Sequence, residues 1–287
     1  MLESITWYKV IDEWYQHNVD GILKPATCRS YNLAVRQIKE RMENCKVTEI
    51  DELKLQEVLN EMAAKSYSKS SVNKIKIVMN SAVHYALLHH YLDSNPIYRL
   101  SIPKNAYEGR VEALSIEEQT VIEEYCRARN GIKDKATLFL LNTGLRASEL
   151  YNLKWEDYHS YNQNSYIFIS KSKTDNGKRI VPLNSAAQKI INQLPQNLGE
   201  YVFTYNSGQL SETIMSDHNK HIRAITGISP FTNHICRHTF ATRALEKGMN
   251  PKALSKILGH SSVAFTMSRY TTISKDFIFE QMKLIDF

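Results

Sequence analysis

The chain has 287 residues, 43% hydrophobic and 23% charged, with a formal net charge of +6 at pH 7, so it is long enough for two globular domains. No apolar run approaches the length of a membrane span, and the first residues lack the pattern of a signal peptide, which argues against a membrane or secreted protein. The four cysteines are scattered without a CxxC pair, which favours a reducing cytoplasm and gives no zinc motif. The excess of basic residues is compatible with a polyanionic partner but is not diagnostic of one.

Apolar residues at helical spacing run through the first hundred residues. They predict a helix after a Ser4 cap and further helices over 28–42, 51–65 and 68–92. The last of these carries three lysines in its first turns, which we interpret as candidate DNA contacts, with a solvated lysine face as the alternative: Lys69, Lys74 and Lys76. Prolines and a glycine follow, and they predict a domain boundary.

The remaining residues mix helices with a short β element. A helix is predicted from a Ser115 cap, with Glu117 and Glu118 in its first turn, and an apolar helix ends at Gly144. Residues 165–183 alternate as two short strands around an Asn-Gly hairpin turn, and helices return from Ser185 to the end. The predicted fold class is therefore mainly α with a small antiparallel β element (α+β).

Four short stretches of this second part carry functional side chains. "NTGLRASELYNLKW" sets Arg146 three residues before Glu149, and "HICRHTFATRAL" sets three basic side chains into an apolar helix. "ILGHSS" contains His260 and "SRYTT" contains Tyr270. Each has an ordinary structural interpretation when it is taken alone: a surface ion pair, a buried satisfied histidine, a helix C-cap and a packing tyrosine.

Taken together, these stretches resemble the tyrosine recombinases of the phage and conjugative-transposon integrase type. "TGLRASELYNLKW" is similar to the first arginine box of that family, and the segment from "HICRHTFATRAL" to "SRYT" is similar to its second box and nucleophile. The resemblance covers essentially the whole chain. It implies a helical core-binding domain over residues 1–103, a linker over 104–112, and a catalytic domain with a C-terminal tail over 113–287.

The resemblance also implies a catalytic set of six residues: Arg146, Lys173, His234, Arg237, His260 and the nucleophile Tyr270. Glu149 is expected to orient an arginine or His234. Lys171 is the alternative to Lys173 as the hairpin lysine. His238 leaves the helix face that His234 shares with Arg237, and we interpret it as structural.

The residue types suit metal-free cleavage of a phosphodiester. Guanidinium groups match phosphate oxygens bidentately and stay charged, so Arg146 and Arg237 can stabilise the charge that develops there. Tyr270 can form a phosphotyrosyl bond, Lys173 can protonate the leaving 5′ oxygen, and histidines can transfer protons or donate to phosphate. No cofactor and no catalytic metal site is expected.

The expected partners are double-stranded DNA and other copies of the chain, without a membrane, in the bacterial cytoplasm or nucleoid. The resemblance implies a clamp around DNA and a tetrameric synaptic complex. The apolar residues after Tyr270 suit packing on their own domain or docking in trans on a neighbouring subunit. Integrases of this type often carry an additional arm-binding domain, which this chain either lacks or has lost by truncation.

Two other functions stay open on the sequence. A type IB topoisomerase shares the catalytic residue types and would relax supercoils as a monomer. A non-catalytic DNA-binding protein on the same scaffold would have no reason to keep Lys173 and Tyr270 together. Capture of a covalent DNA adduct separates an enzyme from a binder, and strand exchange separates a recombinase from a topoisomerase.

Overall fold

The computed structural model of the chain describes residues 5–108, 112–161, 164–170, 178–196, 199–206, 208–260, 262–264 and 266. The chain divides into two compact units, Met1–Arg110 (unit 1) and Val111–Phe287 (unit 2). The division falls within the segment 104–112 that the sequence predicted as a linker. Within the described residues, no helix is long and apolar enough to cross a membrane.

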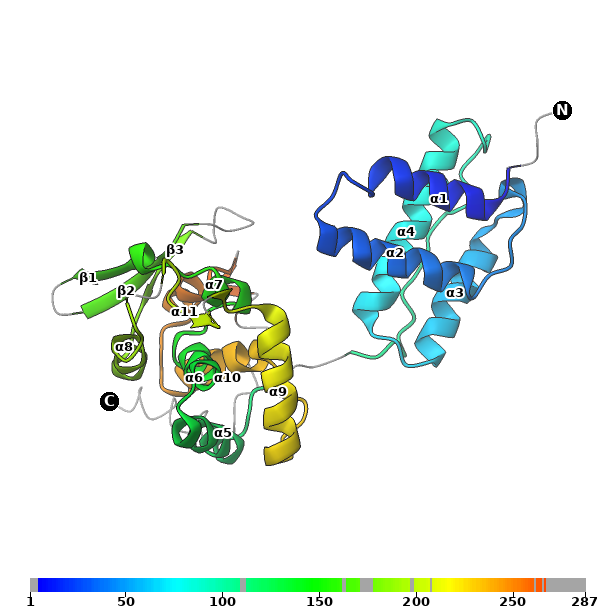
Figure 1. Ribbon diagram of the computed structural model, residues 1–287. Helices are drawn as coiled ribbons and strands as arrows, with labels where there is room; N and C mark the ends of the chain where they lie inside the picture. Colours follow the sequence, from blue (N-terminus) through cyan, green and yellow to red (C-terminus); the bar gives the residue numbers. More distant parts are fainter. Residues whose placement is uncertain are drawn as a thin grey trace, which may run out of the picture. The chain divides into compact units, whose positions relative to one another are not determined.

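Unit 1 is helical. Its described elements are α1 (Trp7–Asn18), α2 (Pro25–Lys39), a 3-10 helix (Val47–Glu49), α3 (Glu52–Ala64) and α4 (Lys69–Leu88) (Figure 1). The central helix is α4, which packs against α1, α2 and α3. Asp51 and Ser68 cap α3 and α4 with their side chains. The cap of α1 is Thr6 and not Ser4, because the Thr6 hydroxyl accepts a hydrogen bond from the amide of Lys9.

Unit 2 combines helices with small sheets, which confirms the predicted fold class. Its described elements are α5 (Ile116–Arg129), α6 (Ile132–Thr143), α7 (Ala147–Tyr151), a 3-10 helix (Trp155–Asp157), β1 (Tyr158–Tyr161), β2 (Asn164–Ile169), β3 (Arg179–Pro182), α8 (Ser185–Asn192), β4 (Thr204–Tyr205), β5 (Gly208–Gln209), α9 (Glu212–Thr226), α10 (Asn233–Glu246) and α11 (Pro251–Leu258). The predicted Ser115 cap of α5 is present and forms a capping box with Glu118.

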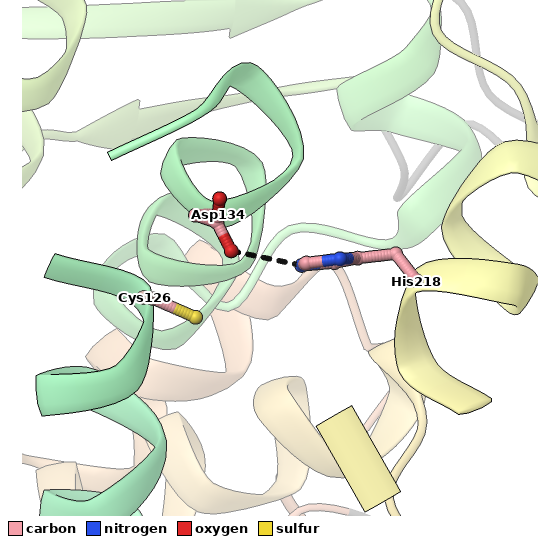
Figure 2. A group of neighbouring side chains, drawn as sticks. All are labelled: Cys126, Asp134 and His218. Atoms are coloured by element: carbon pink, nitrogen blue, oxygen red, sulfur yellow. Dashed lines mark ion pairs between the residues drawn. The ribbon is translucent and has the colours of Figure 1, made fainter. Parts of the chain in front are cut away.

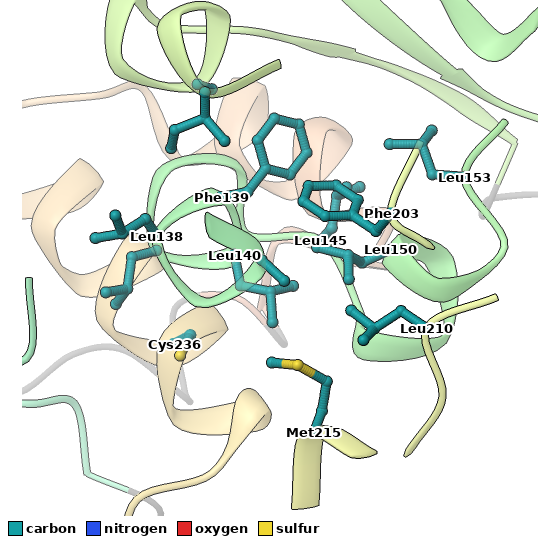
Figure 3. Packing of buried hydrophobic residues seen from close by; sticks show 14 of the residues in the cluster. Leu138, Phe139, Leu140, Leu145, Leu150, Leu153, Phe203, Leu210, Met215 and Cys236 are labelled. Carbon is teal, nitrogen blue, oxygen red and sulfur yellow. The ribbon is translucent and has the colours of Figure 1, made fainter. Parts of the chain in front are cut away.

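The apolar helix α6 lies at the centre of unit 2. It packs against α5, α8 and α10 (Figure 1). Its Phe139 ring meets Phe203 at 5.3 Å between centroids, and both side chains are fully buried. Figure 3 shows the surrounding core, in which Leu150, Leu210 and Met215 close around the same side of α6. This core fixes the helix whose C-terminal end builds the site described below.

The main sheet has three antiparallel strands in the order β1-β2-β3. The sequence predicted β2 and β3 but not β1. Ile167 pairs with Val181 and both are buried, so these two strands have the expected inward face. Arg179 is two residues before Val181 and shares that inward face, because side chains of a strand alternate. The Asn176-Gly177 turn predicted between the two strands lies outside the described residues.

Candidate active site

Two helix ends converge at the site. Helix α6 ends at Gly144 (φ +64°) and α11 ends at Gly259 (φ +66°), both in the left-handed conformation that favours glycine. A β-carbon at either position would also meet a packed side chain, Phe240 at Gly144 and Arg179 at Gly259. The carbonyl groups of Gly144 and Gly259 point at arginines, and they carry the partial negative charge of a helix C-terminus.

Arg237 is held where these helix ends meet. This α10 side chain is buried, with 3% of the residue exposed. Its guanidinium donates to the carbonyl oxygens of Gly144 at 2.8 Å and Leu258 at 2.6 Å, and Nη2 lies 2.9 Å from Nε2 of His260. Hydrogen bonds to helix-terminal carbonyls compensate the burial of the charge. These contacts hold the guanidinium in a fixed orientation before any phosphate binds.

Arg146 and Arg179 share a carboxylate, that of Glu149. Arg146 is the N-cap residue of α7, and its Nη1 lies 2.7 Å from Oε1 of Glu149. Arg179 reaches both oxygens of the same carboxylate, at 2.9 and 2.8 Å. Arg146 also donates to the Gly259 carbonyl at 3.0 Å, while 39% of its side chain stays exposed. The Arg146–Glu149 ion pair is therefore present, but as part of a larger cluster that leaves Arg146 accessible.

Glu149 is ionised in this cluster. Burial alone would raise its pKa, but the hydrogen bonds and charges of Arg179, together with those of Arg146, lower the pKa to about 2. The side chains of Glu149 and Arg179 are only 8% and 5% exposed. The carboxylate is therefore charged at neutral pH and holds two guanidinium groups in place.

We expect Glu149→Gln to lower the free energy of unfolding of unit 2 by about 3 to 5 kcal/mol, because it removes the buried carboxylate that pairs with the buried Arg179. Urea denaturation measures the change. The matched control is Asp217→Asn, which removes an ion pair with Lys220 whose two side chains are mostly exposed, and which should change stability by less than about 1 kcal/mol. Equal effects of the two substitutions would contradict the structural importance of the cluster.

His260 closes the site next to the Gly259 cap. Its Nδ1 lies 2.8 Å from the Thr266 hydroxyl and its Nε2 faces Arg237. A guanidinium can only donate, so Nε2 accepts and the proton lies on Nδ1. Burial, reinforced by the positive charges of Arg237 and Arg146, lowers the pKa of His260 to about 4. The imidazole is therefore neutral at neutral pH.

This shift predicts a loss of stability in weak acid. An unfolded histidine binds a proton below its ordinary pKa of about 6.5, whereas folded His260 stays neutral down to a pKa of about 4. The unfolded state thus gains protons first, and stability falls as the pH drops from about 6.5 towards 4. Between pH 7 and 5 we expect His260 to contribute roughly 1 to 2 kcal/mol of this loss. Urea denaturation of the wild type and His260→Gln at both pH values checks it, and an equal loss in the two proteins would refute the contribution.

The two histidines of α10 lie in contact. The rings of His234 and His238 are 4.6 Å apart and perpendicular. His238 is buried, with 3% of the residue exposed, which suits its predicted structural role. The expectation that it leaves the face of His234 is wrong, because residues four apart on a helix are neighbours. His238 thus supports the ring of His234 from one turn further along α10.

The structure brings together Arg146, Glu149, Arg237 and His260 of the predicted residues. Two members of the predicted catalytic set, Lys173 and Tyr270, lie outside the described residues, as does the alternative Lys171. Arg179 is a further member of the cluster, which the sequence did not single out. The alternation of β3 was the available signal, because Arg179 shares a face with the buried Val181.

The three predicted lysines of unit 1 are not equivalent. Lys69 forms an ion pair with Glu108 at 2.9 Å, and Lys74 donates to the hydroxyl of Ser30. Lys76 instead lines a shallow groove together with Tyr98 and Arg99. The groove places two basic side chains beside an exposed aromatic ring, since 97% of Tyr98 is exposed.

Comparisons with known proteins agree with one another. Residues 114–276 match the family model described as "Phage integrase family". The chain is 27% identical over 276 residues to the tyrosine recombinase XerD of Listeria monocytogenes serotype 4b, covering 90% of this chain and 91% of the relative. It is 26% identical to a XerC-like tyrosine recombinase of Caldanaerobacter subterraneus, covering 94% of this chain and 80% of the relative.

Solved structures with the same fold include two integrases bound to DNA. The Tn1549 transposon integrase (residues 82–397) in complex with circular intermediate DNA superposes with a TM-score of 0.77 at 22% identity, covering 97% of this chain and 99% of that chain. The lambda integrase tetramer bound to a Holliday junction superposes with a TM-score of 0.72 at 19% identity, covering 92% and 78%. The likeness extends over both units of the present chain.

Proposed function

Since the chain belongs to the phage integrase family, we propose that the cluster around Arg146, Arg237 and His260 is the phosphate-binding part of its active site. The protein is a site-specific tyrosine recombinase, an enzyme that cleaves and rejoins DNA. The observation that carries the proposal is the preorganised position of Arg237, buried and held by two helix-terminal carbonyls. A buried guanidinium of this kind needs no rearrangement when charge develops on a phosphate.

In the proposed reaction, Oη of Tyr270 attacks the scissile phosphorus. The Oη–P bond forms while the bond from phosphorus to the 5′ oxygen breaks, leaving a 3′-phosphotyrosyl linkage and a free 5′ hydroxyl. The Tyr270 proton passes to a base, for which His234 is our candidate, and Lys173 protonates the leaving oxygen. Attack by a 5′ hydroxyl of the partner strand reverses these steps and rejoins the DNA. No step is assigned to a metal ion.

The arginine cluster supplies the electrostatic part of this reaction. Arg146 and Arg237 are proposed to donate to the non-bridging oxygens, whose negative charge grows as the nucleophile bonds to phosphorus. Glu149 and Arg179 are positioning residues, since the Glu149 carboxylate ties Arg146 to Arg179. His260 is proposed to add a contact to the phosphate. To make it, the imidazole would give up its hydrogen bonds to Arg237 and Thr266.

The partners are DNA and other copies of the chain. We propose that unit 1 acts as the core-binding domain and that Lys76 and Arg99 contact phosphates from their groove, with Tyr98 beside them. Lys69 and Lys74 are weaker candidates, because each already has a partner in the chain. The place of action is proposed to be the bacterial cytoplasm or nucleoid.

The proposed assembly is a tetramer on two DNA sites, with the apolar tail after Tyr270 docking in trans. We expect deletion of residues 275–287 to impair synapsis and strand exchange while binding to a single site survives. Gel-shift assays with one and two sites measure these steps. A deletion variant that stays folded and recombines normally would contradict docking in trans, and one that unfolds would favour packing in cis.

A recombination assay tests the function as a whole. DNA sites bound by the protein are selected from a random library, and two copies are placed on one supercoiled plasmid. A recombinase is expected to delete or invert the segment between the sites. Relaxation without rearrangement would indicate a topoisomerase, and binding without a nick or an adduct would indicate a non-catalytic DNA-binding protein.

A further inference from the structure

A second cluster of reactive side chains lies away from the arginines, at the turn between α5 and α6. It consists of Cys126 at the end of α5, Asp134 in the first turn of α6 and His218 on α9 (Figure 2). One ligand atom from each residue lies within 4.8 Å of the other two. All three residues are buried, with at most 3% of each exposed.

Two polar atoms of this cluster accept or donate no hydrogen bond among the described residues: Oδ1 of Asp134 and Nε2 of His218. They face one another at 3.4 Å, as the dashed line in Figure 2 shows. The other carboxylate oxygen of Asp134 accepts the amide of Gly131 at 3.1 Å, which fixes the orientation of the group. Buried polar atoms are nearly always hydrogen-bonded, whereas these two atoms have only ion-pair contacts, with each other and, for Asp134, with Arg129, so each is able to take a further partner.

From this geometry we propose that Cys126, Asp134 and His218 form a binding site for a divalent transition-metal ion, with zinc as the best match. Thiolate, imidazole and carboxylate are all zinc ligands. Nitrogen and oxygen ligands about 2.0 to 2.2 Å from a tetrahedral zinc ion lie roughly 3.4 Å apart. The spacing between His218 Nε2 and Asp134 Oδ1 already has this value, and the Cys126 sulfur lies within 4.8 Å of both atoms.

The charges also match. Binding requires Cys126 to lose its proton to solvent, and the thiolate and the Asp134 carboxylate then neutralise a doubly charged ion beside a neutral imidazole. Arg129 lies 3.8 Å from Oδ1 of Asp134 and opposes a cation, but half of its side chain is exposed and it can turn towards solvent.

The site would be structural and separate from cleavage. It joins α5, α6 and α9 at the N-terminal end of α6, whereas Gly144 and the arginines lie at the other end of that helix. A helix rises 1.5 Å per residue, so these ends are on the order of 15 Å apart. A metal ion here would fix the end of α6 remote from the arginine cluster. The proposal does not depend on the proposed reaction.

Metal binding to the intact chain tests the proposal. Metal-free protein is titrated with Zn²⁺ while its Tm is followed, and with Co²⁺ while the thiolate-to-cobalt charge-transfer absorption is recorded. We expect one equivalent of either ion to bind, a rise in Tm with Zn²⁺ but not Mg²⁺, and a charge-transfer band. No binding to the wild-type chain would overturn the proposal.

Two variants assign the ligand. Cys126→Ser should lose the band and weaken Zn²⁺ binding at least 100-fold, whereas Cys236→Ser, an equally buried cysteine of the same unit, should keep both. A triple variant with Cys28, Cys45 and Cys236 replaced by serine retains Cys126 as its one cysteine. If Cys126→Ser does not fold, a charge-transfer band in this triple variant still assigns the thiolate ligand to Cys126. A band that persists without Cys126, or one that is missing from both the triple variant and Cys236→Ser, would contradict the site.

Discussion

Tyr270→Phe is expected to abolish the covalent protein–DNA adduct while the affinity for DNA stays nearly unchanged. The substitution removes one hydroxyl group, whose oxygen is the only atom of the protein that bonds to phosphorus in the proposed reaction. The contacts expected to hold the DNA are arginines, lysines and a histidine, which the variant retains. A nicked suicide substrate, on which the cleaved strand end diffuses away, accumulates the adduct and measures the loss.

The control for this experiment is Tyr205→Phe, which removes a tyrosine hydroxyl elsewhere in unit 2. It should form the adduct at the rate of the wild type. A stable adduct formed by Tyr270→Phe would show that another residue is the nucleophile. Loss of the adduct in both variants would instead indicate a general effect on unit 2.

Arg237→Lys is expected to slow cleavage by about two to three orders of magnitude, the usual effect of removing one preorganised donor from a developing oxyanion. Arg237 uses its planar fork to meet the carbonyls of Gly144 and Leu258 together with His260. A lysine keeps the charge but offers a single nitrogen, so it cannot make these contacts and hold a phosphate in the same geometry. Single-turnover cleavage of a suicide substrate measures the rate.

The matched control lies on the same helix. Arg243 of α10 donates to the Leu114 carbonyl and pairs with Glu246, away from the arginine cluster. Arg243→Lys should therefore cleave at close to the wild-type rate. A normal rate for Arg237→Lys would refute the proposed phosphate contact, and an equal loss in both variants would point to disruption of α10.

Much of the fold follows from local sequence signals. Apolar spacing, together with the Ser115 cap of α5, places the helices to within a few residues, because capping and amphipathic burial act over one or two turns. The strand β1 was not predicted, since "YHSY" is short and carries no apolar alternation, and its pairing with β2 stabilises it. The N-cap of α1 was predicted at Ser4, two residues before Thr6, which caps the helix in the structure.

The candidate site could be predicted in part. The two arginine boxes identify Arg146 and Arg237, but the sequence does not show that Arg237 is held by carbonyls of two other helices. Arg179 joins the cluster only because β3 runs beside α11, where its guanidinium also reaches the Ile257 carbonyl. The group of Cys126, Asp134 and His218 has no local spacing at all, because three helices bring it together.

The chemical identity of the link between protein and DNA tests the proposed reaction most directly. Wild-type protein is trapped on a suicide substrate and digested with a protease, and the nucleotide-bearing peptide is sequenced by mass spectrometry. We expect a 3′-phosphate joined to Tyr270. A nucleotide on any other side chain, a 5′ linkage, or cleavage that leaves no covalent link would contradict the proposed reaction.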